Sequence, residues 1–377
     1  MDADRHRDAL APLNEAASLR LRLEETHRAV RAFLPFVARI AVAVYDPKTA
    51  LLKTFVHSSG GEDPLPHYQA PLDEVPSLKR LLEEGRPRVI NNMLTFESAD
   101  SEHSRRLGRA GYAASYTLPM FSGGVFFGFV FFNAREPGVF GEPALAQLDV
   151  FGHLVSLMVI QELAAARTLS AAIESARHMV HHRDSETGSH LDRMSRFARV
   201  IARALAERHG LDDDYIERVY MYAPLHDIGK IGIPDAILLK PSELNAYERR
   251  VMRTHSEKGR EIIDDFIANF GLASLPAIGI LRNIAEGHHE HMDGGGYPRG
   301  LRGLEIPLEA RIVAVADVFD ALTSRRPYKP AFSNDEAFAT LERLAGRQLD
   351  AECVRALLDN REEIERIQAQ FREDPLG

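Results

Sequence analysis

The sequence predicts two domains of different class: an α+β domain in the N-terminal half, joined by a long helix to an all-α domain in the C-terminal half. Two observations support this division. The chain has 377 residues, which is more than one ordinary domain requires. Strand-like segments occur before about residue 142, whereas helical periodicity with polar loops continues from there to the end. We place the domains at residues 1–160 and 166–377.

Proline and glycine mark the expected boundaries of elements in the N-terminal half. Pro12 suits the first turn of a helix, and Gly85 suits the end of one. Pro47 separates two strand-like segments, and Gly123 with Gly124 indicates a hairpin turn between two others. The predicted elements are a helix over 12–34, strands over 38–46 and 50–58, a helix over 77–85, a strand over 87–91, and hairpin strands over 116–121 and 125–133. Strands enclosed by helices predict an α+β domain.

A long helix is expected to join the two domains. Leucine recurs at near-helical spacing from Leu145 onward, and neither proline nor glycine interrupts residues 153–187. The apolar stripe of this helix either pairs with a second copy, which would make the protein a homodimer, or packs on its own domain. The sequence leaves both alternatives open.

Composition and charge restrict the class of partner. Apolar residues make up 45% and charged residues 27% of the chain, which is typical of a globular protein. The formal net charge of −9 argues against binding to DNA or RNA polymers but permits a small anionic substrate. The only cysteine, Cys353, cannot form an internal disulfide, which favours the cytoplasm. The apolar runs at 124–132 and 150–160 are shorter than the roughly 20 residues that span a bilayer, so no membrane contact is expected.

Residues 288–298, HHEHMDGGGYP, place metal-ligand side chains directly before a glycine-rich segment. His288 and His289 open the stretch, and Gly294 begins its second half. Glycine lacks a Cβ and lets the main chain approach another molecule closely. The stretch therefore predicts a metal site with a substrate pocket beside it.

Other candidate ligands lie in apolar surroundings. His226 and Asp227 occur within YAPLHDIGKIGIP, and Asp317 interrupts ARIVAVADVFDAL. A buried carboxylate is costly unless it is paired or binds a metal. Lys230 follows His226 by four residues and could reach the same site. Asp320, one helical turn after Asp317, could orient a ligand.

The candidate ligands comprise five imidazoles and three carboxylates. They are Glu186, His190, His226, Asp227, His255, His288, His289 and Asp317. One ion takes four to six ligands, so eight side chains indicate at least two ions, with Asp227 as a bridge. Nitrogen and oxygen ligands without thiolate suit Fe, Mn, Co, Ni or Zn. Paired metals serve hydrolysis at phosphorus.

The motifs from about residue 180 to 345 resemble the HD-GYP family, a branch of the HD phosphohydrolases. The motifs are ETGSH, HDIGKIGIPD, THSEKG, HHEHMDGGGYPRGLRGLEIP and RIVAVADVFDALTSRRPYK. The resemblance implies an all-helical domain that hydrolyses cyclic di-GMP to linear pGpG and in some members to GMP. It also implies two or three divalent metal ions. Fe or Mn is the metal expected first, and Ni, Co and Zn are the alternatives.

The resemblance assigns roles to individual positions. The metal ligands would be His190, His226, Asp227, His255, His288, His289 and Asp317, while Glu186 would support a third ion. Lys230 would lie near the phosphate and act in catalysis with Asp227. Tyr297, Arg326 and Lys329 would contact the dinucleotide, because Arg can fork onto phosphate oxygens and Lys supplies a point charge.

The N-terminal half resembles a GAF domain, a sensory fold. The resemblance implies a domain that binds a small molecule or serves mainly in dimerisation, and that could regulate the catalytic half through the joining helix. Two alternatives remain for the C-terminal half. It could hydrolyse another cyclic dinucleotide, such as cyclic GMP-AMP, or it could be a non-catalytic module that binds cyclic di-GMP or a signalling protein. The complete ligand set favours an enzyme.

Overall fold

The chain separates into two compact units, Met1–Ala165 and Ala166–Gly377. The computed structural model describes residues 8–15, 17–60, 63–92, 102–179, 188–270, 278–324 and 331–372. The first unit combines a sheet with helices, and the second is helical. The predicted α+β and all-α classes are therefore confirmed.

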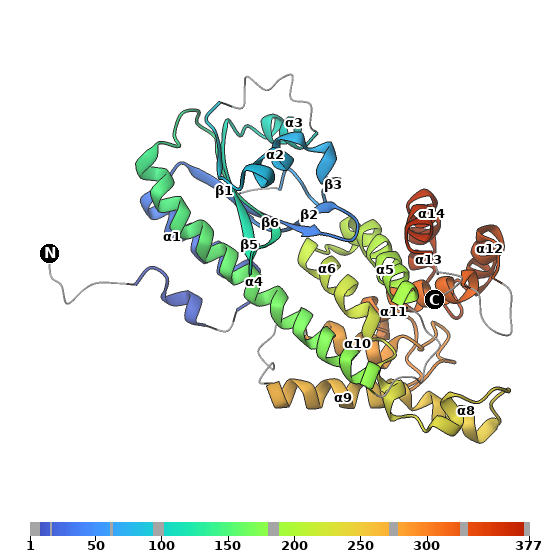
Figure 1. Cartoon of the computed structure of the whole chain (residues 1–377). Helices are drawn as coiled ribbons and strands as arrows, with labels where there is room; N and C mark the ends of the chain where they lie inside the picture. Colours follow the sequence, from blue (N-terminus) through green and yellow to red (C-terminus); the bar gives the residue numbers. More distant parts are fainter. Residues whose placement is uncertain are drawn as a thin grey trace. The chain divides into compact units, whose positions relative to one another are not determined.

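A six-stranded antiparallel sheet forms the centre of the N-terminal unit (Figure 1). Its strand order is β3-β2-β1-β6-β5-β4. The strands are β1 (Val37–Asp46), β2 (Leu51–Ser59), β3 (Gln69–Pro71), β4 (Arg88–Ile90), β5 (Ala114–Ser122) and β6 (Val125–Ala134). The predicted hairpin joins β5 to β6, and its turn places Gly123 at φ 57° and Gly124 at φ 80°. Glycine adopts these positive φ angles without steric cost, which explains the turn.

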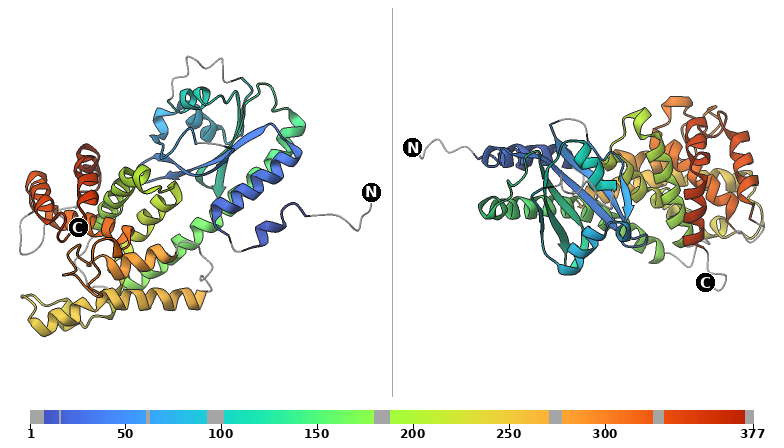
Figure 2. Two further views of the ribbon diagram at one scale, coloured as in Figure 1. Left: turned by 180° about the vertical axis from the view of Figure 1, so that it is seen from behind. Right: turned by 90° about the horizontal axis from the view of Figure 1, so that it is seen from above.

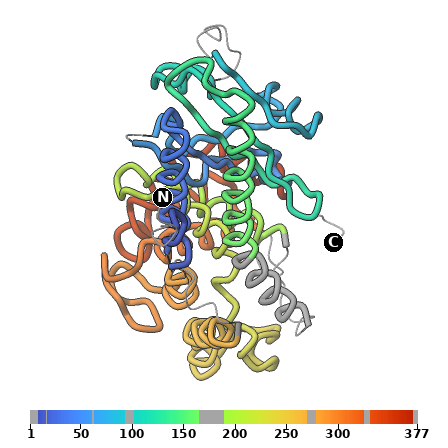
Figure 3. The backbone as a smooth tube through the Cα atoms, turned by 90° about the vertical axis from the view of Figure 1, so that its left-hand side faces the viewer, coloured from blue at the N-terminus to red at the C-terminus, as the bar shows by residue number. Residues whose placement is uncertain are grey.

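Helices cover both faces of this sheet. They are α1 (Leu19–Phe33), α2 (Pro76–Glu84), α3 (Glu102–Arg109) and α4 (Glu142–Met179). Helices α1 and α4 run side by side, joined by an ion pair of 2.6 Å between Arg22 and Glu162 (Figure 3). On the opposite face, Leu78 and Leu81 of α2 pack against the sheet residue Phe131. As predicted, α2 ends at Gly85, which has a left-handed φ of 63°.

Helix α4 is more apolar than the sequence analysis assumed. Its segment Glu142–Ala164 has a mean hydropathy of 1.5 and is long enough to span a membrane by length and composition, with 39% of it buried inside the protein. This segment does not overturn the expectation of no membrane contact. One such helix is weak evidence for a membrane span, because core helices pass the same test. Leu148, Val155 and Val159 of α4 are fully buried in the N-terminal unit.

The C-terminal unit is a bundle of helices around one apolar core (Figure 2). The helices are α5 (Gly188–His209), α6 (Asp213–Tyr222), α7 (Asp235–Leu238), α8 (Ala246–Arg253), α9 (His255–Phe270), α10 (Ile278–Gly287), α11 (Leu308–Thr323), α12 (Asn334–Leu344), α13 (Ala351–Leu358) and α14 (Arg361–Gln370). Phe319 of α11 contacts Phe197 of α5, with ring centroids 5.3 Å apart, and stacks on Phe338 of α12 at 5.1 Å. Helix α11 is therefore central, and it carries Asp317 and Asp320 on a rigid element.

Candidate metal centre and an N-terminal cavity

His226 is fully buried between two short 3₁₀ turns, η5 (Ala223–Leu225) and η6 (Ile228–Gly232). Its Nδ1 lies 2.9 Å from the carbonyl oxygen of Ala223. Because a carbonyl only accepts, Nδ1 carries the proton and Nε2 carries the lone pair. Nε2 lies 3.3 Å from Oδ2 of Asp227 and 3.9 Å from Oδ1 of Asp317. The imidazole therefore presents a ligand atom towards two carboxylates.

His255 and His288 are held in the same tautomer. Nδ1 of His255 donates to the carbonyl of Met252 at 2.8 Å, and Nδ1 of His288 donates to that of Ile284 at 3.0 Å. Their Nε2 atoms are 3.4 Å apart, and Nε2 of His255 is 3.1 Å from Oδ1 of Asp227. Three electron-pair donors thus face one another, an arrangement that a cation placed among them would stabilise. This donor set fits a metal ion.

A buried carboxylate orients His190. Oδ2 of Asp320 accepts from Nδ1 of His190 at 2.6 Å, and the same carboxylate accepts from Nε of Arg193 at 2.6 Å and from Oγ of Ser324 at 2.8 Å. Burial opposes the ionisation of Asp320, but the hydrogen bonds from His190 and Arg193 outweigh it and hold the pKa of the carboxyl below its ordinary value. Asp320 therefore fixes Nε2 of His190 as the ligand atom.

The structure brings seven of the eight predicted ligands into two neighbouring groups. Within each group, the ligand atoms lie within 4.8 Å of one another. The first group is Asp227, His255, His288 and His289, and the second is His190, His226 and Asp317. The 3.3 Å contact between His226 and Asp227 connects the groups. Glu186, the eighth predicted ligand, lies outside the described residues.

The electrostatics of the first group suit a cation. Burial would raise the pKa of Asp227, but Lys230 and His226 together hold it well below its usual range, so the carboxylate is charged. Burial is the main cause that lowers the pKa of His289, and it keeps this imidazole neutral. Metal binding requires these deprotonated forms.

Gly229 sets the distance between the His-Asp pair and helix α9. A Cβ at this position would lie 1.8 Å from the carbonyl oxygen of His255 and 2.4 Å from the nitrogen of Gly259. Real Cβ atoms do not approach backbone so closely, so only glycine permits this packing. The close approach places His255, the first residue of α9, opposite Asp227.

The glycine-rich segment folds back over the histidines. A Cβ at Gly296 would lie 2.5 Å from the carbonyl oxygen of His289, so this glycine also permits a close approach. The nitrogen of Tyr297 donates to that same carbonyl at 3.1 Å. The Tyr297 ring consequently lies 4.8 Å from the His289 ring and 6.2 Å from the His255 ring, measured between centroids. Tyr297 thus forms one wall of the site.

Glu290 holds this segment in place. It is 4% exposed, and its carboxylate accepts from the backbone nitrogens of Arg299, at 2.7 Å, and Leu301, at 2.9 Å. Glu290 belongs to neither ligand group among the described residues. The role of Glu290 was not predicted from the sequence. One feature could have indicated it: Glu290 precedes a glycine-rich loop whose backbone nitrogens need hydrogen-bond acceptors.

Two cations lie beside the ligand groups. Nζ of Lys230 is 2.7 Å from Oδ2 of Asp227, which places this lysine at the site. The guanidinium of Arg253 lies over the Tyr297 ring at 5.1 Å from its centroid, a contact that sequence reasoning missed. The predicted substrate contacts Arg326 and Lys329 lie outside the described part of the chain. His291 joins neither ligand group of the described residues.

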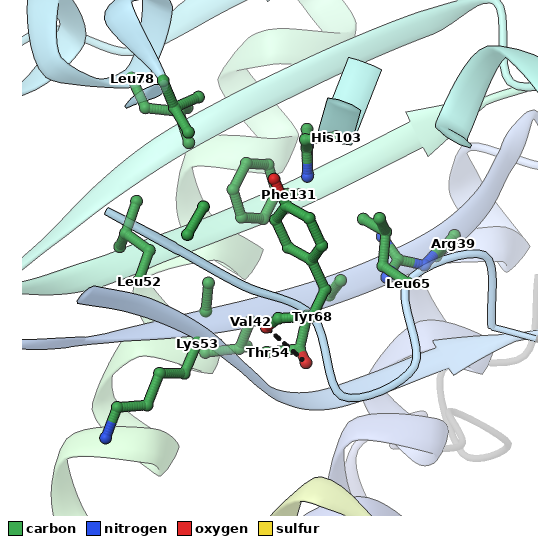
Figure 4. A pocket seen from close by; sticks show the side chains of 14 residues that line it. Arg39, Val42, Leu52, Lys53, Thr54, Leu65, Tyr68, Leu78, His103 and Phe131 are labelled. Atoms are coloured by element: carbon green, nitrogen blue, oxygen red, sulfur yellow. Dashed lines mark hydrogen bonds between the residues drawn. The ribbon is translucent and has the colours of Figure 1, made fainter. Parts of the chain in front are cut away.

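The N-terminal unit contains a separate small cavity of about 30 Å³ between the sheet and α2 (Figure 4). Arg39, Tyr68, His103 and Phe131 are among its lining residues. The His103 ring lies 5.8 Å from the Tyr68 ring and 5.5 Å from the Phe131 ring. Desolvation, followed by the charges of Arg39 and Arg88, lowers the pKa of His103 to about 3. The cavity therefore has a neutral, aromatic lining with a cation at one side.

Comparisons with known proteins address both units. The model of a family described as "HD domain" matches residues 163–353. The chain is 47% identical over 192 residues to the cyclic di-GMP phosphodiesterase response regulator RpfG of Xanthomonas campestris pv. campestris, covering 51% of this chain and 48% of that protein. It is 35% identical over 204 residues to 3'3'-cGAMP-specific phosphodiesterase 2 of Vibrio cholerae, covering 54% of this chain and 37% of that protein. The chain thus spans half or less of the length of these relatives.

The chain is similar to the GAF domain/HD domain protein from Geobacter sulfurreducens at 18% identity and a TM-score of 0.32, covering 39% of this chain and 97% of that one.

Proposed function

Because the chain belongs to the HD domain family, we propose that its C-terminal domain is a metal-dependent phosphodiesterase that hydrolyses cyclic di-GMP to linear pGpG, with GMP as the alternative final product. The observation that carries this proposal is the pair of adjoining ligand groups joined through His226 and Asp227. The name of the Xanthomonas relative supports cyclic di-GMP as the substrate.

Divalent ions, Fe or Mn first, would be held by the two groups of nitrogen and oxygen ligands. A bound pair supplies the Lewis acidity that phosphodiester hydrolysis requires. Asp227 would be shared between the two ligand groups, because Oδ1 faces His255 and Oδ2 faces His226. A third ion at Glu186 remains a prediction.

Lys230 would act on the substrate phosphate. Its ammonium lies 2.7 Å from Asp227 and its side chain is 20% exposed, so it can face an incoming anion while Asp227 holds it. A cation in this position offsets the negative charge that develops on the phosphate oxygens and can protonate the departing 3′ oxygen. Tyr297 would form the wall of the nucleotide pocket, and Arg326 and Lys329 remain predicted dinucleotide contacts.

The test is hydrolysis by protein purified without oxygen. Metals per chain are measured, Fe or Mn is restored, and the products from cyclic di-GMP are separated by chromatography. We expect at least two ions per chain and conversion to pGpG or GMP. If cyclic di-GMP binds but no metal supports turnover, the domain is a non-catalytic binding module.

Hydrolysis of another cyclic dinucleotide is the second candidate, favoured by the similarity to the 3'3'-cGAMP-specific enzyme. Both dinucleotides are assayed side by side with the same protein preparation. A kcat/KM that is at least tenfold higher for cyclic GMP-AMP would reassign the substrate while leaving the metal chemistry unchanged.

We also propose that the N-terminal domain regulates hydrolysis. Its cavity is the candidate site of regulation, and α4 begins in this unit and continues past its boundary at Ala165. Ala70→Phe would fill the cavity, since Ala70 lines it. We expect a changed kcat with unchanged metal content. Equal kinetics for this variant and the wild type would remove the cavity from regulation.

We also propose that the protein forms a homodimer and is located in the cytoplasm. Val150 is 68% exposed and Leu157 is 64% exposed, so α4 carries apolar surface that a second copy could cover. The single cysteine is buried, which is compatible with a reducing compartment. Sedimentation of the wild type and of Leu157→Glu tests the dimer, and a wild-type monomer would exclude it.

A further inference from the structure

We propose that Arg253 binds the second phosphodiester of the substrate, the one that is not being hydrolysed. The inference rests on the proposed function, because it assumes that a cyclic dinucleotide enters the site. It adds a substrate-binding residue that the motifs did not indicate, and it explains why a cyclic dinucleotide would be preferred over a simple diester.

The position of Arg253 is fixed by the same turn that fixes a ligand. Arg253 ends α8, and His255 begins α9. The turn between them is closed by Thr254, whose nitrogen and hydroxyl both donate to the carbonyl of Val251, at 3.1 and 2.7 Å. Nδ1 of His255 donates back to Met252 at 2.8 Å. The Arg253 backbone is therefore held at a constant distance from the ligand group.

The side chain of Arg253 is held over the wall of the site. Its guanidinium lies 5.1 Å from the centroid of the Tyr297 ring, and that ring lies 4.8 Å from the His289 ring. A guanidinium over an aromatic face is held by cation–π attraction and keeps its in-plane N–H groups available for hydrogen bonds. One aromatic ring therefore separates Arg253 from a metal ligand.

The two cations of the site differ in how they are paired. Lys230 is held by Asp227 at 2.7 Å. Arg253 is exposed, and no carboxylate in the described ranges forms an ion pair with it. Its neighbour along the chain, Arg249, reaches Glu243 at 3.7 Å and the carbonyl of Leu244 at 2.7 Å. Arg253 thus has charge and donors to offer to an anion at the mouth of the site.

The chemistry of the substrate supplies the matching group. A cyclic dinucleotide has two phosphodiesters, each with one negative charge, and only one can lie at the ligand groups while it is hydrolysed. The second must lie elsewhere on the site wall. Arginine forks onto two phosphate oxygens with charge-assisted hydrogen bonds, so an exposed guanidinium beside Tyr297 fits this role.

The experiment compares two substrates and a matched control variant. Cyclic di-GMP carries the second phosphodiester, and bis(p-nitrophenyl) phosphate has only one. The variants are Arg253→Ala, Arg253→Lys and the control Arg250→Ala. Arg250 lies on the same helix over the ring of Tyr247, at 6.0 Å from its centroid. Metal content and equilibrium binding of cyclic di-GMP are measured on every protein.

For Arg253→Ala we expect the KM and Kd for cyclic di-GMP to rise by about ten- to a hundredfold, the loss of one charge-assisted hydrogen-bond pair. The kcat, the metal content and the kinetics with bis(p-nitrophenyl) phosphate should change less than twofold. Arg253→Lys should recover part of the loss, since the charge returns without the fork. Arg250→Ala should match the wild type.

Other outcomes overturn the inference. An unchanged KM and Kd for cyclic di-GMP in Arg253→Ala would remove the residue from the substrate. Equal losses with both substrates would show that Arg253 acts through Tyr297 or the metal ligands. Failure of the proposed function is distinguishable: a wild type that binds but does not hydrolyse cyclic di-GMP would disprove the function, while weaker binding by Arg253→Ala would still support this contact. A wild type that does not bind it would disprove both.

Discussion

The buried histidines of the two domains use their ring nitrogens differently. In the N-terminal domain, Nε2 of His27 donates to the carbonyl of Val37 at 3.1 Å and Nδ1 accepts from the hydroxyl of Ser58 at 2.8 Å, so both nitrogens have partners. In the C-terminal domain, His255 and His288 donate through Nδ1 and direct Nε2 towards each other and towards a carboxylate. Burial makes a neutral imidazole in both places, but only converging lone pairs make a ligand set.

The charges around the histidines differ in the same way. Burial lowers the pKa of His103 in the N-terminal cavity, and the charges of Arg39 and Arg88 lower it further against the opposing charge of Asp63. Asp227 and Asp317 stand beside His226 in the C-terminal domain. Cations near an imidazole repel a metal ion, whereas carboxylates attract one. We therefore expect metal binding to depend on the neighbouring carboxylates and not on the number of buried histidines.

Removing the shared carboxylate should have the largest effect. In Asp227→Asn, the histidines keep their tautomers, but the charge that faces His226, His255 and Lys230 is lost. We expect metal content to fall by at least one ion per chain and kcat to fall by about a thousandfold or more, since metal and charge contribute several kcal/mol to the transition state. Metal analysis and turnover of cyclic di-GMP measure this. Full turnover with metals retained would refute the scheme.

Changing the carboxylate that orients His190 should have a smaller effect. In Asp320→Asn, the amide loses one acceptor and faces Arg193 with a donor. We expect metal affinity to fall by about ten- to a hundredfold, as is typical of residues that orient ligands. Metal titration measures the change, and circular dichroism reports folding. Ser324→Ala is the control, because it removes one donor to Asp320 and leaves the His190 contact intact.

Loosening the glycine-rich segment should affect the substrate and not the metal. In Glu290→Gln, one of the two backbone nitrogens at Arg299 and Leu301 loses its acceptor. We expect KM for cyclic di-GMP to rise by about tenfold, the cost of one buried hydrogen bond, with metal content unchanged. Loss of metal would instead show that Glu290 supports the ligand groups directly. Glu305→Gln is the control, because Glu305 also accepts from a backbone nitrogen but is exposed.

Acid should weaken the N-terminal domain through His27, with the smallest effect. Burial lowers the pKa of His27 in the folded state, so the unfolded chain binds the proton more readily. The stabilisation by neutral His27 is complete above pH 6.5 and is lost as the pH falls below 6.5 towards the folded-state pKa. We expect calorimetry between pH 7 and 5 to show a steeper fall in Tm for the wild type than for His27→Gln. Equal slopes would contradict the assignment.

The candidate carboxylates could be read from the sequence because a buried carboxylate is costly, whereas His190 and His255 were assigned by the resemblance to the HD-GYP family. Carboxylates such as Asp227 and Asp317 stand out within apolar segments, and Asp320 follows Asp317 by one helical turn. The β5–β6 hairpin was also readable, because Gly123 and Gly124 supply the backbone angles of its turn. These features depend on local spacing alone.

Contacts between distant segments could not be read in the same way. Arg253 looks like any exposed arginine of an amphipathic helix until the fold brings Tyr297 beneath it. Glu186, Arg326 and Lys329 stay predictions, because they lie outside the described residues.

Gly229 matters when the activity of a related sequence is inferred from its motifs. It has no side chain to offer as a ligand, yet the absence of a Cβ lets the turn after Asp227 pack directly on the start of α9. Alanine there would push the helix outward and separate His255 from its partners while every ligand remained in the sequence. A motif search that counts ligands would still score such a chain as an enzyme, although its metal site could not assemble. A glycine at this position of the motif is therefore as diagnostic of activity as the metal-ligand residues are.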